Sequence, residues 1–318
     1  MRVPEYKYPV EQCSVPAVRR PALEAYRVLR RECLERLQGE AETSVLNQVL
    51  NLTWYTAVFR TLNEARRLEP ERRVNAAMWE LITAGHANII TLGIRRLVDR
   101  HPNADSVWNV IGRLERRSEL MTRECFVCHD GLPFDNEAVA EKLAQSFAAD
   151  TTSRWLPTRG PDAFDTSARM HETFDALCGH PSLRKPLDRI APTVFGALRD
   201  QLKQAAVEKV CTMVDKTIAH AERTALGAVA VPIATYQDVD AALGTIVRVC
   251  QFISSNMLAD GGFASVMATP QFDVLEYLDG PWCLTQTLPA LHDNWQLVSR
   301  SMDHWATSAD EVLNLPSP

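Results

Sequence analysis

The feature of the sequence that most constrains the fold is the spacing of its apolar residues, which recur three and four positions apart over long stretches. Between residues 22 and 42 the apolar stripe consists of Leu23, Tyr26, Leu29, Cys33 and Leu37. This spacing places side chains on one face of an α-helix. The sequence contains no convincing strand hairpin, no fixed-period repeat and no low-complexity tract. We therefore predict an all-α helical bundle.

Similar patterns predict helices along most of the remaining chain. The predicted ranges are 42–69, 75–100, 106–120, 136–148, 192–226 and 235–258, with further helices between residues 265 and 315. Pro192 suits the first turn of its helix, and Ser106 suits an N-cap. The shared apolar face of the 75–100 helix is expected to consist of Ile82, His86, Ile89, Gly93 and Leu97.

Three parts are expected along the chain. Residues 1–40 are predicted to form an extended, proline-containing arm followed by a helix. Residues 41–260 are predicted to form the helical bundle, with a loop-rich insertion at about 119–191 where the helical pattern weakens. Residues 261–318 are predicted to form a C-terminal helical extension.

The charge of the chain is unevenly distributed. The net charge is -6, which argues against a general nucleic-acid coat protein. Residues 1–125 contain 20 Lys and Arg against 16 Asp and Glu, and subtraction from the totals of 34 and 40 leaves 14 against 24 for residues 126–318. The two parts therefore have net charges of +4 and -10. Either a locally basic face exists on an acidic protein, or two solvated helix surfaces differ in sign.

The sequence gives no indication of export or membrane insertion. The first twelve residues, MRVPEYKYPVEQ, lack the apolar core of a signal peptide. No apolar run approaches the roughly 20 residues that span a bilayer. We therefore expect a soluble, cytoplasmic protein without membrane contacts, whose eight cysteines are reduced thiols.

The stretch MVDKTIAHAE, residues 213–222, is a candidate catalytic segment. On an α-helix Lys216, His220 and Arg223 share one face. Cationic groups arranged in this way suit a phosphate. The imidazole of His220 could remove a proton from a ribose 2′-hydroxyl or donate one to a leaving oxygen. The alternative is that Lys216 and Arg223 are solvated and that His220 packs against a neighbouring helix.

The stretch CFVCH is a candidate metal or haem site. Cys125, Cys128 and His129 have the C-x-x-C-H spacing of c-type haem attachment, a reaction that normally takes place outside the cytosol. Two thiolates at this spacing can also share one tetrahedral zinc ion, which Cys178 and His180 could complete. Ordinary free thiols are the third possibility. No other cofactor is expected.

Three arginines near the end of the 75–100 helix are candidate substrate contacts. Arg95, Arg96 and Arg100 could bind the phosphates of a nucleic-acid backbone. Asp99 lies close enough in sequence to pair with Arg95 or Arg96. A solvated or self-paired helix end is the alternative.

Three segments in this order resemble a known superfamily. They are AGHANIITLGIRRLVDRHPNADSVWNVIGRLE, VDKTIAHAE and TYQDVDAALGTIVRVCQFI. Together they are similar to the HEPN superfamily, the higher-eukaryote and prokaryote nucleotide-binding helical domains, and within it to the abortive-infection U-type branch. The resemblance covers roughly residues 45–258. Its most specific element is D-K-x-x-A-H, formed by Asp215, Lys216, Ala219 and His220.

This resemblance implies an all-α bundle that often dimerises so that paired helices bring two motifs together. Many members are metal-independent ribonucleases of toxin–antitoxin or anti-phage systems. Their motif is an arginine, four to six residues and a histidine, in which the histidine serves acid–base chemistry and the arginine holds the scissile phosphate. His220 matches the histidine. Val214 occupies the matching arginine position, so the pattern is broken here.

Three functional hypotheses remain open at this stage. The first is an endoribonuclease that uses His220, with Lys216 and Arg223 as phosphate contacts. The second is a catalytically inactive RNA-binding or protein-interaction module. The third is a metal-stabilised interaction module centred on Cys125, Cys128 and His129. The expected partners are a second copy of the chain, RNA, and an antitoxin or defence-system protein. No P-loop, GxGxxG, HExxH or GxSxG pattern occurs, which removes the easily recognised nucleotide-binding and hydrolase classes.

Overall fold

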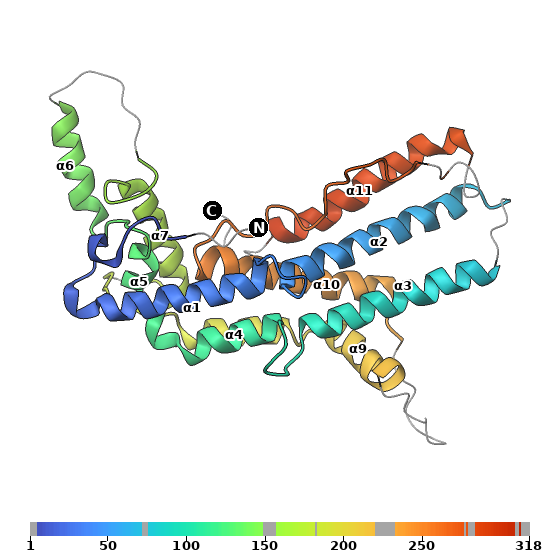
Figure 1. Ribbon diagram of the computed structural model, residues 1–318, viewed down its shortest axis with the longest axis horizontal. Helices are drawn as coiled ribbons and strands as arrows, with labels where there is room; N and C mark the ends of the chain where they lie inside the picture. The colour runs from blue at the N-terminus through green and yellow to red at the C-terminus, as the bar shows by residue number, and fades with distance from the viewer. Residues whose placement is uncertain are drawn as a thin grey trace. The chain divides into compact units, whose positions relative to one another are not determined.

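The fold was analysed in a computed structural model, which describes residues 5–71, 76–148, 157–181, 183–219, 233–276, 278, 284–308 and 312 (Figure 1). Every regular element in these ranges is a helix, and the single β pairing there is an isolated bridge between Thr122 and Arg189. The predicted all-α class is confirmed. Within the same ranges no helix combines the length and apolar character needed to cross a membrane.

The helices follow one another with short connections. Their bounds are α1 Arg20–Gln38, α2 Val45–Leu68, α3 Ala76–Leu97, α4 Val107–Arg116, α5 Arg123–Cys128, α6 Asn136–Ala148, α7 Phe164–Cys178, α8 Pro192–Gln201, α9 Ala205–Met213, α10 Tyr236–Phe252 and α11 Leu288–Thr307. Two π-helical segments, Val214–Ala219 and Ile253–Met257, continue α9 and α10. The helices predicted over 42–69, 75–100, 136–148 and 235–258 are thus confirmed. Ser106 also acts as predicted, because its hydroxyl accepts a hydrogen bond from the backbone N–H of Asn109 at 3.2 Å.

The chain divides into two compact units. The first consists of Met1–Glu40, Val110–Leu198 and Phe252–Gly262, and the second of Ala41–Asn109, Arg199–Gln251 and Phe263–Pro318. Each unit is assembled from segments far apart in the sequence. The two units are described separately below.

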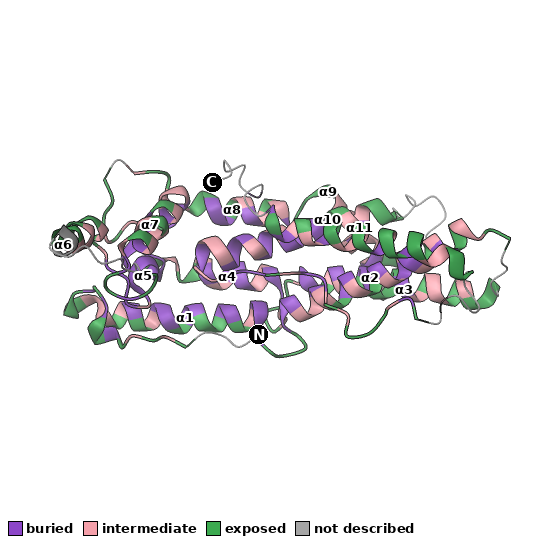
Figure 2. Ribbon diagram, turned by 90° about the horizontal axis from the view of Figure 1, so that it is seen from above, coloured by how far each residue is buried: buried purple, intermediate pink, exposed green. Residues whose placement is uncertain are grey.

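In the first unit, α1 buries one complete face. All five residues of the predicted stripe (Leu23, Tyr26, Leu29, Cys33 and Leu37) are buried, so this prediction is confirmed. Buried residues are purple in Figure 2, and they form a continuous line along α1. Helix α7, which was not predicted, packs against α5 and α6 in the same unit.

The N-terminal arm is not extended, so that prediction is wrong. It contains the 3₁₀ turns Val10–Gln12 and Ala17–Arg19. The carboxylate of Asp130 accepts hydrogen bonds from the backbone N–H groups of Lys7 at 2.7 Å and Tyr8 at 3.2 Å. The ring of Tyr8 fills the space beside Gly131, whose φ of +83° and lack of a side chain both suit the contact. These contacts hold the arm against the body of the unit.

In the second unit, α2 packs against α3, while α11 covers α2 and α9 lies against α3. The two central helices approach closely at Gly93, because any side chain at that position would collide with Leu52. Ser44 begins α2, and its hydroxyl accepts a hydrogen bond from the N–H of Asn47 at 3.4 Å. The close approach at Gly93 sets which faces of α3 are covered.

The predicted buried face of α3 is wrong at Ile89, which is 47% exposed. The buried positions of this helix are His86, Ile90, Thr91, Ile94 and Leu97. Two apolar residues stand side by side at 89 and 90, and the spacing pattern fits either of them. The packing against α2 selects Ile90.

Two other predicted helices differ in the structure. The single helix expected over 192–226 begins at Pro192 as predicted but ends at Gln201, and α9 begins at Ala205. The 3₁₀-type bonds from Lys203 N–H to Asp200 O and from Gln204 N–H to Gln201 O form the intervening turn. Residues 220–226 lie outside the described part of the chain.

The segment 265–276 is also not helical, contrary to expectation. The Thr53 hydroxyl donates a hydrogen bond to the backbone O of Val266. Asp303 accepts a hydrogen bond from the Ser265 hydroxyl at 2.6 Å. Bonds to α2 and α11 therefore take the place of the intrahelical bonds that a helix would make here.

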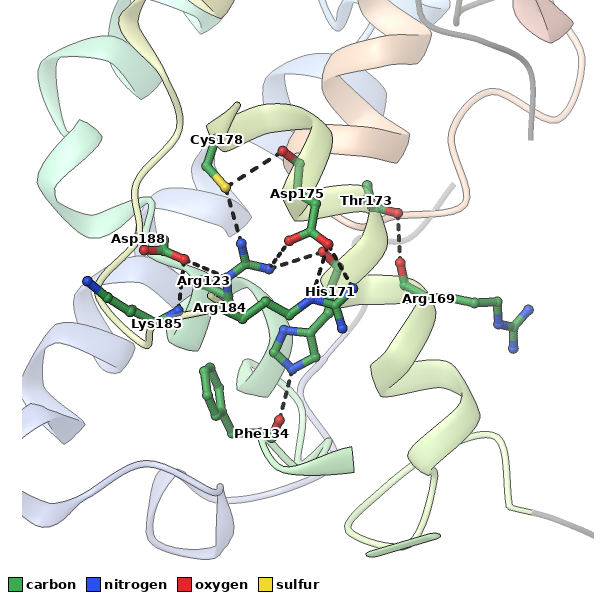
Figure 3. Close-up of polar contacts among 10 residues, drawn as sticks. All are labelled: Arg123, Phe134, Arg169, His171, Thr173, Asp175, Cys178, Arg184, Lys185 and Asp188. Atoms are coloured by element: carbon green, nitrogen blue, oxygen red, sulfur yellow. Dashed lines mark hydrogen bonds and ion pairs between the residues drawn. The ribbon is translucent and has the colours of Figure 1, made fainter. Parts of the chain in front are cut away.

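A buried arginine organises the first unit (Figure 3). The side chain of Arg123 is 0% exposed, and its guanidinium pairs with Asp175 at 2.7 Å and Asp188 at 3.1 Å. It also donates hydrogen bonds to the backbone O of His171 and to Sγ of Cys178, both at 3.1 Å. A buried charge is tolerated only when its donors are satisfied in this way. The network joins α5, α7 and the segment before α8.

Replacing Arg123 by Met should destabilise the protein by about 3–5 kcal/mol, because Asp175 and Asp188 would remain as carboxylates without their buried partner. The measurement is the free energy of unfolding in urea. Arg169→Met is the matched control, since Arg169 is two-thirds exposed, pairs only with the exposed Asp165, and points away from the network in Figure 3. The control should change the free energy by less than about 0.5 kcal/mol. Equal effects of the two substitutions would contradict this interpretation.

A buried histidine lies between α2 and α3. The ring of His86 stacks on Phe59 with centroids 4.0 Å apart and an interplanar angle of 7°. Among the described residues, neither ring nitrogen has a hydrogen-bond partner. Burial, with a smaller contribution from the charge of Arg60, lowers the pKa of His86 to about 4. The imidazole is therefore neutral in the folded protein at neutral pH.

Folding stability should fall as the pH is lowered from about 6.5 towards 4. In this range the unfolded chain binds a proton at His86 that the folded chain does not, so the contribution is up to about 1.4 kcal/mol per pH unit. Denaturation in urea at several pH values measures the slope. His86→Phe keeps a ring against Phe59 and should reduce the slope relative to the wild type. Parallel slopes for the two proteins would show that His86 is not responsible.

Candidate functional site

A depression of about 440 Å³ lies in the second unit, where the end of α3, the start of α4 and helix α9 meet. The polar residues and the aromatic residue that line it are Arg95, Arg100, Trp108, Glu208, Cys211, Thr212 and Asp215. It contains two of the three arginines predicted to bind phosphate. It also contains the first residue of the D-K-x-x-A-H element.

Arg95 joins α3 to the segment that follows α9. Its Nε donates a hydrogen bond to a carboxylate oxygen of Asp215 at 2.9 Å, and its Nη1 lies 3.5 Å from Asp99. Burial alone would lower the pKa of Arg95, but the hydrogen bond and charge of Asp215 and the charge of Asp99 raise it overall. About one-third of the Arg95 side chain is exposed, and nearly half of that of Asp215. The guanidinium is thus held in place yet accessible from solvent.

Arg100 and Trp108 form the second cationic feature of the depression. The guanidinium carbon of Arg100 lies 4.5 Å from the centroid of the Trp108 ring, and Arg199 and Lys203 lie 5.2 and 5.9 Å from it. Cations at these distances are attracted by the electrons of the indole ring. Among the described residues no carboxylate pairs with Arg100. Its N–H donors are therefore oriented by the ring and remain available to an anion.

Arg96 points to a different part of the unit. It lines a groove of about 840 Å³ between α2 and α3 and a smaller polar hollow that also contains Asp99. The predicted trio is therefore divided, with Arg95 and Arg100 at the depression and Arg96 outside it.

The predicted catalytic segment is only partly described. Residues Val214–Ala219 form a π-helix, in which the hydrogen bonds run to the fifth residue instead of the fourth. The α-helical spacing assumed for Lys216 therefore does not apply there, although its side chain is exposed as expected. His220 and Arg223 lie outside the described residues. A π-helical turn is itself a common feature of functional sites.

Helix α9 is fixed to the start of α10. The ammonium of Lys209 lies 2.7 Å from the Asp238 carboxylate, which also accepts hydrogen bonds from the backbone and side chain of Thr235. The hydrogen bond from Lys209, followed by those from Thr235, lowers the pKa of Asp238 to about 2. Lys209 is thereby engaged and contributes no free cation to the depression.

The thiol in the depression is not activated. Burial raises the pKa of Cys211 to about 11, despite the nearby charge of Arg95. The reactive form of a cysteine is the thiolate, which is scarce at neutral pH when the pKa is this high. Cys211 is therefore a lining residue and not a candidate nucleophile.

The C-x-x-C-H stretch has no metal-site geometry in the structure. Cys125, Cys128 and His129 are all buried at the end of α5, and Nδ1 of His129 lies 2.7 Å from the backbone O of Phe126. Burial raises the pKa of both thiols and lowers that of His129 to about 3. Cys178 instead accepts a hydrogen bond from Arg123. Within the described ranges no group of three His, Cys, Asp or Glu side chains is arranged to hold a metal ion, so the zinc and haem interpretations have no structural support.

Two parts of the site were not recognised in the sequence. Trp108 follows the predicted cap Ser106, but nothing in the sequence places it against Arg100. Asp215 belongs to the D-K-x-x-A-H element, yet its bond to Arg95 links positions 120 residues apart. Both contacts depend on the packing of α9 against α3.

Comparison with known families agrees with this fold. Residues 34–277 match the family model HEPN_AbiU2, described as AbiU2. Because the match covers most of the chain, this protein belongs to the AbiU2 branch of the HEPN superfamily, an abortive-infection defence domain. The resemblance seen in the sequence is confirmed. No curated protein and no solved structure matches the chain.

Proposed function

We propose that this AbiU2 protein acts in abortive infection as a metal-independent endoribonuclease, with the depression at Arg95, Arg100 and Trp108 as the site that holds the RNA backbone. The observation that carries the proposal is the hydrogen bond between Arg95 and Asp215. It brings an accessible guanidinium beside the segment that contains the D-K-x-x-A-H element. Nucleic-acid backbones are bound mainly through such cationic contacts to phosphate.

The proposed chemistry is an internal phosphoryl transfer. The ribose 2′-oxygen attacks the adjacent phosphorus while the 5′-oxygen leaves, which yields a 2′,3′-cyclic phosphate and a 5′-hydroxyl. His220 takes the 2′-hydroxyl proton or protonates the leaving oxygen. General acid–base assistance of this kind is worth roughly 100- to 10,000-fold. Lys216 and Arg223 are the proposed further phosphate contacts.

The arginine that is missing from the motif is proposed to be supplied from α3. Val214 is buried and apolar, and Lys216 offers a point charge that cannot make two parallel bonds to a phosphate. Arg95 has a planar guanidinium with five donors. Only part of that donor set is used by Asp215 and Asp99. Its remaining donors are able to contact the charge that develops on the phosphate oxygens.

A non-catalytic RNA-binding role is the second candidate. The observation that favours it is that Arg95 already pairs with two carboxylates, which partly cancel its charge. In that case the depression would bind RNA without cleavage. Nuclease assays separate the two candidates.

The wild-type protein should cleave labelled RNA in the presence of EDTA and leave cyclic phosphate ends. His220→Ala should reduce the rate at least about 100-fold, because the acid–base group is removed. His292→Ala is the control, since His292 is an exposed histidine on α11. Cleavage that persists unchanged in His220→Ala would remove this residue from the mechanism. Binding of RNA without any cleavage by the wild type would favour the second candidate.

Substitutions at Arg95 test the proposed guanidinium. Arg95→Ala should lower kcat by roughly 100-fold or more with a smaller effect on KM, since a donor to developing charge is lost. Arg95→Lys keeps the ion pair with Asp215 and should still lose most of the activity. The exchange R95D/D215R, which moves the guanidinium to the other side of the pair, should recover part of it. Full activity in Arg95→Lys would mean that Arg95 serves only as a structural ion pair.

A further inference from the structure

The outer face of α3 is unusually apolar for a surface helix. Four large apolar side chains are exposed on it, namely Met78 at 56%, Leu81 at 73%, Ile89 at 47% and Leu92 at 37%. Single exposed apolar residues are normal, but several in one continuous stripe mark an interaction surface. The exposed positions of α3 are green in Figure 2.

The spacing of this stripe is symmetric about Gly85. Leu81 and Ile89 lie four residues on either side of it, and Met78 and Leu92 lie seven residues on either side. Four and seven residues correspond to one and two turns, so all of these positions share a face with Gly85. A Cβ added at Gly85 would meet no atom within 4 Å, so the centre of the stripe is open.

The two halves of the stripe differ in shape. The half after Gly85 borders the groove of about 840 Å³ between α2 and α3, which Ile89, Leu92 and Tyr55 line. The half before Gly85 carries the most exposed side chain of the helix, Leu81. One half is therefore hollowed where the other projects.

We propose that the outer face of α3 packs against the same face of a second copy of this chain, antiparallel and about a two-fold axis through Gly85. In this arrangement Leu81 contacts Ile89 of the partner subunit, and Met78 enters the groove at Leu92 of the partner subunit. A two-fold interface must be complementary to itself. The symmetric spacing and the pairing of projection with hollow both satisfy this requirement.

Other occupants fit the surface less well. A helix that lies on a lipid surface carries many Lys and Arg residues along its polar face. On α3 the basic residues are confined to Arg95 and Arg96 at its last turn. An unrelated protein partner would not require a stripe that is symmetric about one glycine. A second copy is therefore the occupant that the pattern selects.

The mass of the full-length protein in solution tests the interface. Light scattering at micromolar concentration should give twice the 35.6 kDa of one chain. Leu81→Glu should give the mass of a single chain, because the charge would be buried against Ile89 of the partner subunit. Leu297→Glu is the matched control, since Leu297 is 65% exposed on α11, and this variant should remain a dimer. A monomeric wild type, or a Leu81→Glu variant with the wild-type mass, would overturn the proposal.

Two further variants identify the geometry. Ile89→Lys should also be monomeric, whereas the double variant L81E/I89K should recover the dimer through two symmetric ion pairs across the axis. Packed helix axes are about 8–10 Å apart, so two Gly85 Cα atoms on the axis would be within roughly the 4–7 Å that a disulfide spans. Gly85→Cys should therefore form a cross-linked dimer under mild oxidation, and Ala87→Cys, on another face of the helix, should not. Failure of both the rescue and the cross-link would exclude this antiparallel arrangement even if the protein is dimeric.

Discussion

The close packing of α3 against α2 is the contact on which the second unit depends. It needs a residue without a side chain at Gly93, so that Leu52 can approach the helix backbone. It is continued by the stacked rings of Phe59 and His86. Once this face of α3 is covered, the other directions of the helix are determined. The arginines at its end reach the segment after α9, and its apolar outer face is left towards solvent.

The two units handle buried polar groups in different ways. In the second unit His86 is buried without a hydrogen-bond partner among the described residues and avoids the cost of a buried charge by staying neutral. In the first unit Arg123 keeps its charge and is surrounded by two carboxylates, a carbonyl and a sulfur atom. A charged network of this kind contributes less to stability than its number of contacts suggests, because removing the ions from water costs free energy. Its effect is mainly to fix which segments meet.

The helices were largely predictable because their apolar positions follow one period. The stripe from Leu23 to Leu37 and the cap at Ser106 depend on neighbours in sequence, and both were predicted correctly. The choice between Ile89 and Ile90 was not predictable, since both fit the period and only the packing against α2 decides. The break after Gln201 was missed for a similar reason, because helix-forming residues continue through it.

The candidate site was predictable only in part. Arg95 and Arg100 were chosen from their charge and position at a helix end, and they do lie together. Their partners were not predictable, since Asp215 is 120 positions away and Trp108 belongs to another helix. The network around Arg123 was missed for the same reason, as its carboxylates come from positions 175 and 188.

The double pairing of Arg95 has a consequence for how the depression responds to ions. A free cation that docks onto a nucleic acid releases a condensed counterion from the polymer, and this release makes affinity fall steeply with added salt. The charge of Arg95 is already offset by Asp99 and Asp215. A phosphate that docks there must share the guanidinium with these carboxylates, so fewer counterions are released than the number of arginines implies. Recognition at this position then depends more on the direction of the N–H groups than on bulk electrostatic attraction.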